Sequence, residues 1–183
     1  MRAFFDTLEI KSTISALDVA MGSGRVSMDL LVHLYDNVDG FDCSTNSVKE
    51  MLEHKKLYAR LGDISLSTME KFPWKNDYSG IWMSWCIGYP KENDLIEFLK
   101  KAKLHLYAPL GSATRNTRHG SYIFVLETVL QGDGGEFYDN GHLVMKQATI
   151  EGIFDKAGLK IVDSTPPTVV HENFRPVMVW ALQ

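Results

Sequence analysis

The fold is decided by one stretch, Ala16-Leu17-Asp18-Val19-Ala20-Met21-Gly22-Ser23-Gly24-Arg25. An apolar run leads into it from residue 13. After it, apolar side chains recur at the three- and four-residue spacing of a helix, namely Val26, Leu30, Leu31 and Leu34. The stretch therefore predicts a strand, a glycine turn and a helix, which is where an α/β protein holds a nucleotide-like ligand. Gly22 and Gly24 carry no Cβ, so the backbone there is free to approach such a ligand.

A second apolar run, residues 38–42, predicts the next strand and ends in Asp42. This acid follows Gly24 by eighteen residues, close to the gap of about 20 residues expected for a carboxylate that accepts hydrogen bonds from ribose hydroxyls. The alternative is an acid at the start of a helix. Ser27 stands where a dinucleotide fingerprint has its third glycine. The turn therefore favours the looser Asp-x-Gly-x-Gly pattern of S-adenosylmethionine enzymes, with Ala20 at the first glycine.

Strand and helix patterns alternate along the rest of the chain. Further strands are predicted over residues 58–61, 78–85, 122–129, 159–162 and 177–182. Helical faces are predicted within residues 48–52, 95–102 and 150–157, and a short helix within 1–12. Ser44 or Thr45 caps the first of these faces, and Gly158 ends the third. Such alternation predicts an α/β, doubly wound, seven-stranded and mostly parallel sheet. Its last strand is expected to be antiparallel, because no helical pattern joins the final pair.

Length and composition describe an ordinary globular chain. Its 183 residues predict a single domain over residues 1–183, and the net charge of −4 gives no reason to expect a nucleic-acid partner. Cys43 and Cys86 lack metal-ligand spacing, so we expect no metal site and a reducing compartment. With no apolar run of about 18 residues and no secretory signal, we expect no membrane span and a cytoplasmic or nuclear location. The polar residues 107–121 are either a mobile insertion or a partner-binding surface.

One motif carries a family resemblance. Ile81-Trp82-Met83-Ser84-Trp85-Cys86-Ile87-Gly88-Tyr89 resembles the Ile-Trp-x-Gln-Trp-x-x-Gly-His stretch of the protein α-N-terminal methyltransferases. These enzymes methylate the terminal amine of proteins that begin Xaa-Pro-Lys once Met is removed. The glycine turn with its final Arg, residues 38–42 and residues 94–101 are similar to the same family. The resemblance covers residues 13–104 well and 122–183 loosely, and it implies the class I methyltransferase fold.

The resemblance also implies a site for S-adenosyl-L-methionine. Its cofactor positions fall on Ala20, Gly22, Gly24, Arg25, Asp42, Cys43, Ser44, Asp63, Ile64 and Ser84. Among these, Asp42 would take the ribose, and Asp63 and Ile64 would flank the adenine. Trp85 would line the channel for the first residues of the substrate.

Several family positions have changed in this chain. Tyr89 replaces a channel histidine, Thr128 replaces an asparagine that follows the fifth strand, and Asn140 aligns with the catalytic aspartate. Asp139 lies one residue away, so a one-residue gap in the alignment would restore the acid. By resemblance, Trp85, Tyr89, Thr128 and Asn140 form the substrate-binding set.

The chemistry requires a proton acceptor for the amine. A free α-amine has a pKa near ~7.7, so a modest base is sufficient. Acidic residues gather where no Lys or Arg occurs, between Arg118 and Lys146: Glu127, Asp133, Glu136 and Asp139, with His142 among them. This stretch is either an exposed acidic turn or a site that holds a substrate Lys and supplies Asp139 or His142 as the base.

We therefore expect an S-adenosylmethionine-dependent methyltransferase that acts on a protein N-terminal α-amine. The alternative is a methyltransferase-like subunit that no longer catalyses and serves as a binding partner in a complex. Ala20, Ser84, Thr128 and Asn140 motivate that alternative. A third hypothesis is a methyltransferase that acts on another nucleophile, such as a small molecule or RNA.

Overall fold

The computed structural model describes residues 4, 8, 10, 12–108, 120–169 and 175–183. Five strands make its parallel part: β1 (Ser15–Val19), β2 (Asn37–Asp42), β3 (Leu61–Leu66), β4 (Gly80–Ser84) and β5 (Tyr122–Leu130). The remaining strands are β6 (Phe137–Asp139), β7 (His142–Lys146), β8 (Ile161–Ser164) and β9 (Val177–Leu182). The sheet runs in the order β3-β2-β1-β4-β5-β7-β6, and β9 pairs with both β5 and β8. Both β9 pairings are antiparallel, so the predicted doubly wound sheet with an antiparallel last strand is confirmed.

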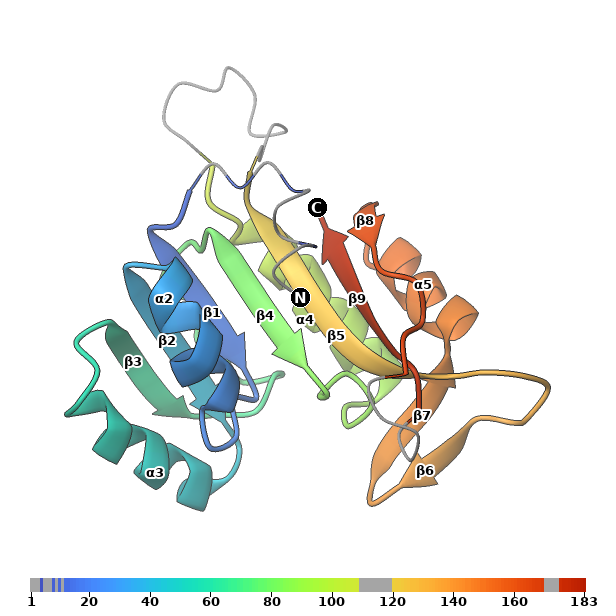
Figure 1. Ribbon diagram of the computed structural model, residues 1–183, viewed down its shortest axis with the longest axis horizontal. Coiled ribbons are helices and arrows are strands. Elements are labelled where there is room, and N and C mark those ends of the chain that lie inside the picture. The colour runs from blue at the N-terminus through green and yellow to red at the C-terminus, as the bar shows by residue number, and fades with distance from the viewer. Residues whose placement is uncertain (1–3, 5–7, 9, 11, 109–119, 170–174) are drawn as a thin grey trace.

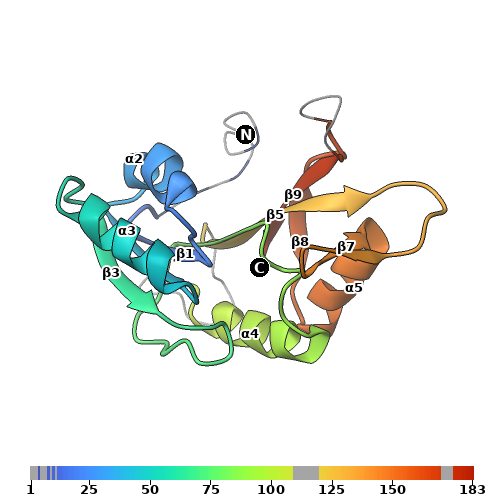
Figure 2. The ribbon, with the colours of Figure 1, turned by 90° about the horizontal axis from the view of Figure 1, so that it is seen from below.

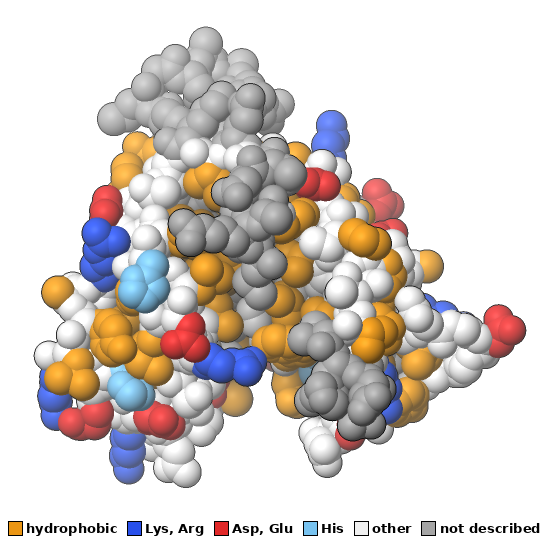
Figure 3. All heavy atoms as spheres, in the orientation of Figure 1, with side chains coloured by type: hydrophobic (Ala, Val, Ile, Leu, Met, Phe, Trp, Pro, Cys, Tyr) orange, Lys and Arg blue, Asp and Glu red, His pale blue; other side chains and the backbone are white. Residues whose placement is uncertain are grey.

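Helices cover both faces of the sheet (Figures 1 and 2). On one face lie the short π-helix η1 (Ser27–Leu31), α2 (Val32–Leu34) and α3 (Thr45–Lys55), and on the other lie α4 (Glu92–Leu104) and α5 (Gln147–Lys156). The parallel strands point in one direction, so their carboxyl ends meet along one edge of the molecule. At this edge the surface is notched between the part that carries β1–β3 and the part that carries β6 and β7 (Figure 3).

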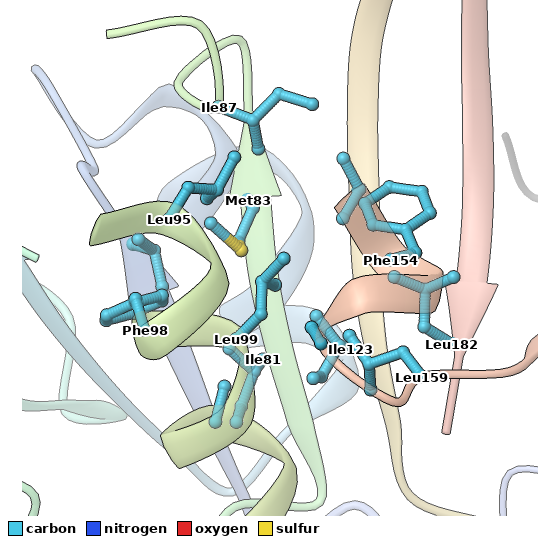
Figure 4. Close-up of a cluster of buried hydrophobic side chains, with 14 of the residues drawn as sticks. Ile81, Met83, Ile87, Leu95, Phe98, Leu99, Ile123, Phe154, Leu159 and Leu182 are labelled. Carbon is cyan, nitrogen blue, oxygen red and sulfur yellow. The ribbon is translucent and has the colours of Figure 1, made fainter. Parts of the chain in front are cut away.

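Two layers of apolar side chains hold the helices to the sheet. Alternate residues of β4 serve the two layers: Ile81 and Met83 face α4, and Trp82 faces the other way. In α4 the buried positions follow the helical period. Leu95 and Leu99 lie beside Met83 and Ile81 of β4 in Figure 4. Phe98 packs against Phe41 of β2, with ring centroids 6.1 Å apart. Strands that are buried on both faces have continuous apolar sequences, which is why β4 and β5 could be predicted from the sequence.

The predicted position of the third strand is wrong. The sequence predicted it at residues 58–61, ended by Gly62-Asp63, whereas β3 extends over Leu61–Leu66. Residues 58–60, predicted as strand, instead belong to the turn between α3 and β3, where the Tyr58 amide donates a hydrogen bond to the His54 carbonyl. Because β3 is an edge strand, its polar residues meet solvent and leave no continuous apolar run.

A hairpin in the predicted acidic stretch was not anticipated. Strands β6 and β7 pair antiparallel, with Asp139 opposite His142. Asn140 and Gly141 form the two-residue turn, with φ of 50° and 83°. Asn-Gly is the preferred pair for such a turn because both positions need positive φ, so this dipeptide was a signal for the hairpin in the sequence.

The predicted ends of two helices can be compared with the structure. Ser44 rather than Thr45 is the N-cap of α3, and its hydroxyl accepts a hydrogen bond from the Ser47 amide at 3.3 Å. Gly158, at φ 72°, follows α5 as predicted. Most of residues 1–12, where a helix was predicted, and most of residues 107–121 lie outside the described residues. Among the helices that are described, none is long and apolar enough to cross a membrane.

Candidate active site

The carboxylate of Asp42, at the end of β2, holds the turn after β1 by a hydrogen bond. Asp42 is buried, and its Oδ2 accepts a hydrogen bond from the Gly22 amide at 2.9 Å while Oδ1 accepts one from the Ser44 amide at 2.7 Å. The turn needs positive φ at Gly22 and Gly24, and also at Ala20, where φ is 52°. Asp42 therefore shapes the glycine turn and the start of α3 together.

A cavity of about 470 Å³ opens beside this turn, at the carboxyl ends of β1, β2 and β4. Its walls come from four segments of the chain: Ala20; Phe41, Asp42 and Cys43; Ser67, Thr68, Met69 and Glu70; Trp85, Cys86, Tyr89 and Pro90. Burial raises the pKa of the Cys86 thiol, so that side chain is an apolar part of the wall. An apolar cavity with a few polar groups at its rim is the usual form of a small-molecule site.

Trp85, which lines this cavity, is in contact with Arg25. The Arg25 guanidinium carbon lies 5.3 Å from the centre of the Trp85 ring, which is a cation–π contact. Trp85 has a φ of 51° directly after β4, and its amide donates to the Leu126 carbonyl at 2.9 Å. A left-handed conformation at a bulky residue costs on the order of 1–3 kcal/mol and is concentrated at functional sites.

A second cavity, of about 250 Å³, brings together the predicted catalytic and substrate-binding residues. Its walls hold Asp139 and His142, the two predicted bases, and Trp85, Tyr89, Thr128 and Asn140, the predicted substrate set. Glu127, Val144 and Arg175 complete it and were not predicted as site residues. Trp85 and Tyr89 belong to both cavities, so the two spaces adjoin at these rings.

Within the second cavity, a buried carboxylate contacts the imidazole. Glu127 Oε2 lies 3.2 Å from His142 Nε2, and the two side chains are 1% and 13% exposed. The Tyr89 ring stands edge-on to the imidazole, with centroids 4.8 Å apart. Glu127 was noted in the sequence only as one of several acids, because its partnership with His142 depends on the placement of β7.

Asp139 is occupied by an internal partner. Its Oδ2 accepts a hydrogen bond from the Arg175 guanidinium at 3.3 Å, and the same guanidinium stacks over the Phe137 ring at 4.8 Å. Asn140, at the hairpin turn, donates to Asp139 Oδ1 at 3.2 Å. His142 is therefore the more enclosed of the two predicted bases, and Asp139 is a half-exposed, paired carboxylate.

Of the ten predicted cofactor positions, only Ala20, Asp42 and Cys43 line the first cavity. The seven that do not are Gly22, Gly24, Arg25, Ser44, Asp63, Ile64 and Ser84. Asp63 and Ile64 lie inside β3, where the Asp63 amide donates to Asp39 Oδ1 at 2.8 Å and Ile64 packs against the apolar layer under α3. Ser84 ends β4 without being part of the wall. Residues 67–70 occupy the wall in their place, because β3 ends five residues later than the sequence predicted.

Asp18 is a buried acid behind the glycine turn that was not proposed as a site residue. Its Oδ2 accepts a hydrogen bond from the Ser27 hydroxyl at 2.6 Å. Burial raises the pKa of Asp18 to about 7, the Ser27 hydrogen bonds oppose the rise, and the Asp42 charge adds to it. Asp18 belongs to the stretch from Ala16 to Arg25, so its position near the end of the first strand could be predicted from the sequence.

Solved structures define the class of protein. A SAM-dependent methyltransferase from Leishmania major superposes with a TM-score of 0.83 at 23% identity, covering 100% of this chain and 69% of its own. A glycopeptide N-methyltransferase complexed with S-adenosyl-L-methionine gives a TM-score of 0.75 at 12% identity, covering 100% and 84%. The fold is that of the class I S-adenosylmethionine-dependent methyltransferases.

The sequence comparison gives the family within this class. The family model of the AdoMet-dependent proline di-methyltransferases matches residues 2–183, so the chain belongs to that family. N-terminal Xaa-Pro-Lys N-methyltransferase 1 of Xenopus tropicalis is 34% identical over 97 residues, which are 50% of this chain and 42% of the relative. Alpha N-terminal protein methyltransferase 1 of Caenorhabditis elegans is 24% identical over 170 residues, which are 92% and 68%. The match therefore spans less than half the length of the Xenopus relative.

Proposed function

We propose that the chain binds S-adenosylmethionine in the first cavity and methylates the α-amine of a protein N-terminus that enters through the second. One observation carries the proposal: the cavities adjoin at Trp85 and Tyr89, with His142 in the wall of the second. Direct transfer needs the methyl group and the amine aligned in adjoining spaces. Relatives named as N-terminal Xaa-Pro-Lys methyltransferases support the α-amine as acceptor.

The first cavity fits the cofactor. Its volume of about 470 Å³ lies within the range of about 300–1,000 Å³ for small-molecule sites. Phe41 and Met69 offer apolar surface to a base, and each oxygen of Asp42 accepts a single backbone amide. Because a carboxylate oxygen has more than one lone pair, Asp42 retains capacity to accept ribose hydroxyls. Arg25, beside Trp85, is placed to hold a carboxylate.

The bound cofactor supplies an activated methyl group on a sulfonium. The protein must then orient the amine and accept its proton. Trp85 and Tyr89 provide aromatic walls at the junction of the cavities, and His142 provides a nitrogen base within a largely buried wall. Asp139 is the less suited acceptor, because Arg175 already neutralises part of its charge. We assign the proton transfer to His142.

The alternative hypotheses receive no separate support. A non-catalytic subunit was suggested by the family positions that have changed, yet the Thr128 and Asn140 side chains line the same cavity as the candidate bases. The family model matches nearly the whole chain. A neighbour named as an O-methyltransferase, the mitomycin 7-O-methyltransferase, shares the fold alone, at 12% identity.

The test compares two peptides that begin Xaa-Pro-Lys, one with a free terminus and one Nα-acetylated. With methyl-labelled S-adenosylmethionine, we expect label in the free peptide and none in the acetylated control. Equal labelling of both peptides would place the acceptor on a side chain and would refute the α-amine proposal. Absence of labelling together with absence of cofactor binding in calorimetry would refute the enzyme proposal.

A further inference from the structure

We infer that Glu127 is a positioning residue, which holds the hydrogen of neutral His142 on Nε2 so that Nδ1 accepts the proton of the substrate amine. The inference rests on the proposed function, in which His142 is the base. Nothing in the glycine turn or the aromatic motif pointed to this acid, which lies on β5, fifteen residues from the imidazole.

The hydrogen bonds of Glu127 determine the tautomer. Its Oε1 accepts from the Thr128 amide at 2.8 Å, and its Oε2 lies 3.2 Å from His142 Nε2. An ionised carboxylate only accepts hydrogen bonds. Nε2 must therefore donate, and in a neutral imidazole the other nitrogen then carries the lone pair.

The imidazole is held in place by its neighbours. A Cβ at Gly88 would lie 2.7 Å from His142 Cε1 and 2.8 Å from Nε2, so the ring occupies space that only glycine leaves free. The Leu143 amide donates to the Gly88 carbonyl at 2.9 Å, which ties β7 to the loop after β4. The Tyr89 ring meets the imidazole edge-on from the same loop. These contacts fix the ring plane, and Glu127 fixes the site of the hydrogen within it.

The proton transfer is balanced within these groups. An N–H bond of the protonated terminal amine breaks, its electron pair becomes the lone pair of the neutral amine that attacks the methyl group, and the proton binds the lone pair of His142 Nδ1. The imidazolium that forms keeps its Nε2–H on Glu127, and a carboxylate at this distance stabilises the new charge. The other charged and titratable groups lining this cavity are Tyr89 from the loop after β4, Asp139 from β6 and Arg175 before β9.

The first experiment reads the tautomer directly and needs no substrate. Two-bond ¹H–¹⁵N spectra of histidine-labelled protein, recorded where imidazole is neutral, should show His142 with its hydrogen on Nε2, assigned by loss of the signal in His142→Gln. Glu127→Met, which keeps the volume but removes the acceptors, should give a mixture of tautomers. A wild-type hydrogen on Nδ1, or an unchanged Nε2–H form in Glu127→Met, would overturn the inference. If Glu127→Met does not fold, the wild-type spectrum still decides.

The second experiment measures kcat and KM with the free peptide. Glu127→Gln should lower kcat at least tenfold with peptide KM within threefold, because general-base catalysis contributes about 10²–10⁴-fold and part of it is lost. Glu127→Asp, which keeps a carboxylate at this position, should recover part of the lost kcat. Glu97→Gln changes an exposed acid on α4 in the same way, so it is the control and should keep the wild-type kcat and KM. A kcat within threefold of wild type in Glu127→Gln, or no recovery in Glu127→Asp, would contradict the positioning role. Absence of wild-type turnover would refute the proposed function, while the spectra would still judge Glu127.

Discussion

Replacing Asp42 by Ala should loosen the glycine turn and weaken cofactor binding at once. In the structure this carboxylate accepts both the Gly22 and the Ser44 amides, at 2.9 and 2.7 Å. Its removal leaves two backbone donors without their partner at the wall of the proposed cofactor cavity. The substitution therefore tests whether one side chain organises both the turn and the ribose position.

The magnitude follows from those two donors. An unsatisfied buried donor costs about 1–3 kcal/mol. Gly22 and Ser44 are partly exposed, so water can hydrogen-bond to their amides and reduce this cost. We therefore expect the free energy of unfolding to fall by about 2 kcal/mol. Losing the ribose contact should weaken cofactor affinity by a further 1–3 kcal/mol, on the order of 5- to 150-fold in Kd. Asp42→Asn keeps one acceptor oxygen, so its losses should be intermediate.

Urea unfolding and calorimetric titration with S-adenosylhomocysteine measure the two effects separately. The control is Asp36→Ala, because Asp36 is 72% exposed and its ion pair with Arg60 is 3.8 Å long, an interaction of about 0–1 kcal/mol at most. If Asp42→Ala matched that control in both urea midpoint and Kd, Asp42 would organise neither the turn nor the site.

Three further predictions concern the same region. Ala20→Gly should stabilise the protein by up to about 1 kcal/mol in urea unfolding, because a non-glycine residue at φ 52° is strained; a clear loss would argue against that strain. Asp18 has a pKa raised to about 7 in the folded state, so the native state binds more protons than the unfolded state between about pH 4 and 7, and stability falls as pH rises through this window. Between pH 5 and 8, the free energy of unfolding of wild type should fall by about 2–3 kcal/mol more than that of Asp18→Asn. Parallel curves of stability against pH would contradict the raised pKa of Asp18. Arg175→Ala should free Asp139 and lower the KM of a peptide with Lys at its third position more than that of a peptide with Gln there; equal changes would show that Asp139 does not face that residue.

The sequence predicted the parts of the fold in which burial is complete. Strands β4 and β5 are apolar throughout because both of their faces are covered, and the glycine turn is set by local backbone geometry. Strand β3 was misplaced, because Gly62, Asp63 and Ser65 at an exposed edge follow no apolar pattern. Residues 67–70, which follow β3, line the first cavity, whereas Asp63 and Ile64 lie inside the strand.

The sequence identified most of the residues that line the second cavity, but not the contacts between them. Trp85, Tyr89, Asp139 and His142 were identified from a motif and from local charge, and they line one cavity. The contact of Glu127 with His142 depends on where β7 pairs with β5, which the structure places at Val129–Met145. No local pattern sets that register, so the partner of the imidazole could not be deduced. Arg175, which pairs with Asp139, lies just before β9, in a segment that was not predicted to be part of the site.

The most direct test of the account is the position of the transferred methyl group. A peptide that begins Xaa-Pro-Lys, incubated with the chain and S-adenosylmethionine, should gain mass in steps of one methyl group. Fragmentation in tandem mass spectrometry should place every added methyl on the nitrogen of the first residue. Methyl groups on the lysine side chain, or an unmodified peptide beside a protein saturated with cofactor, would contradict the account.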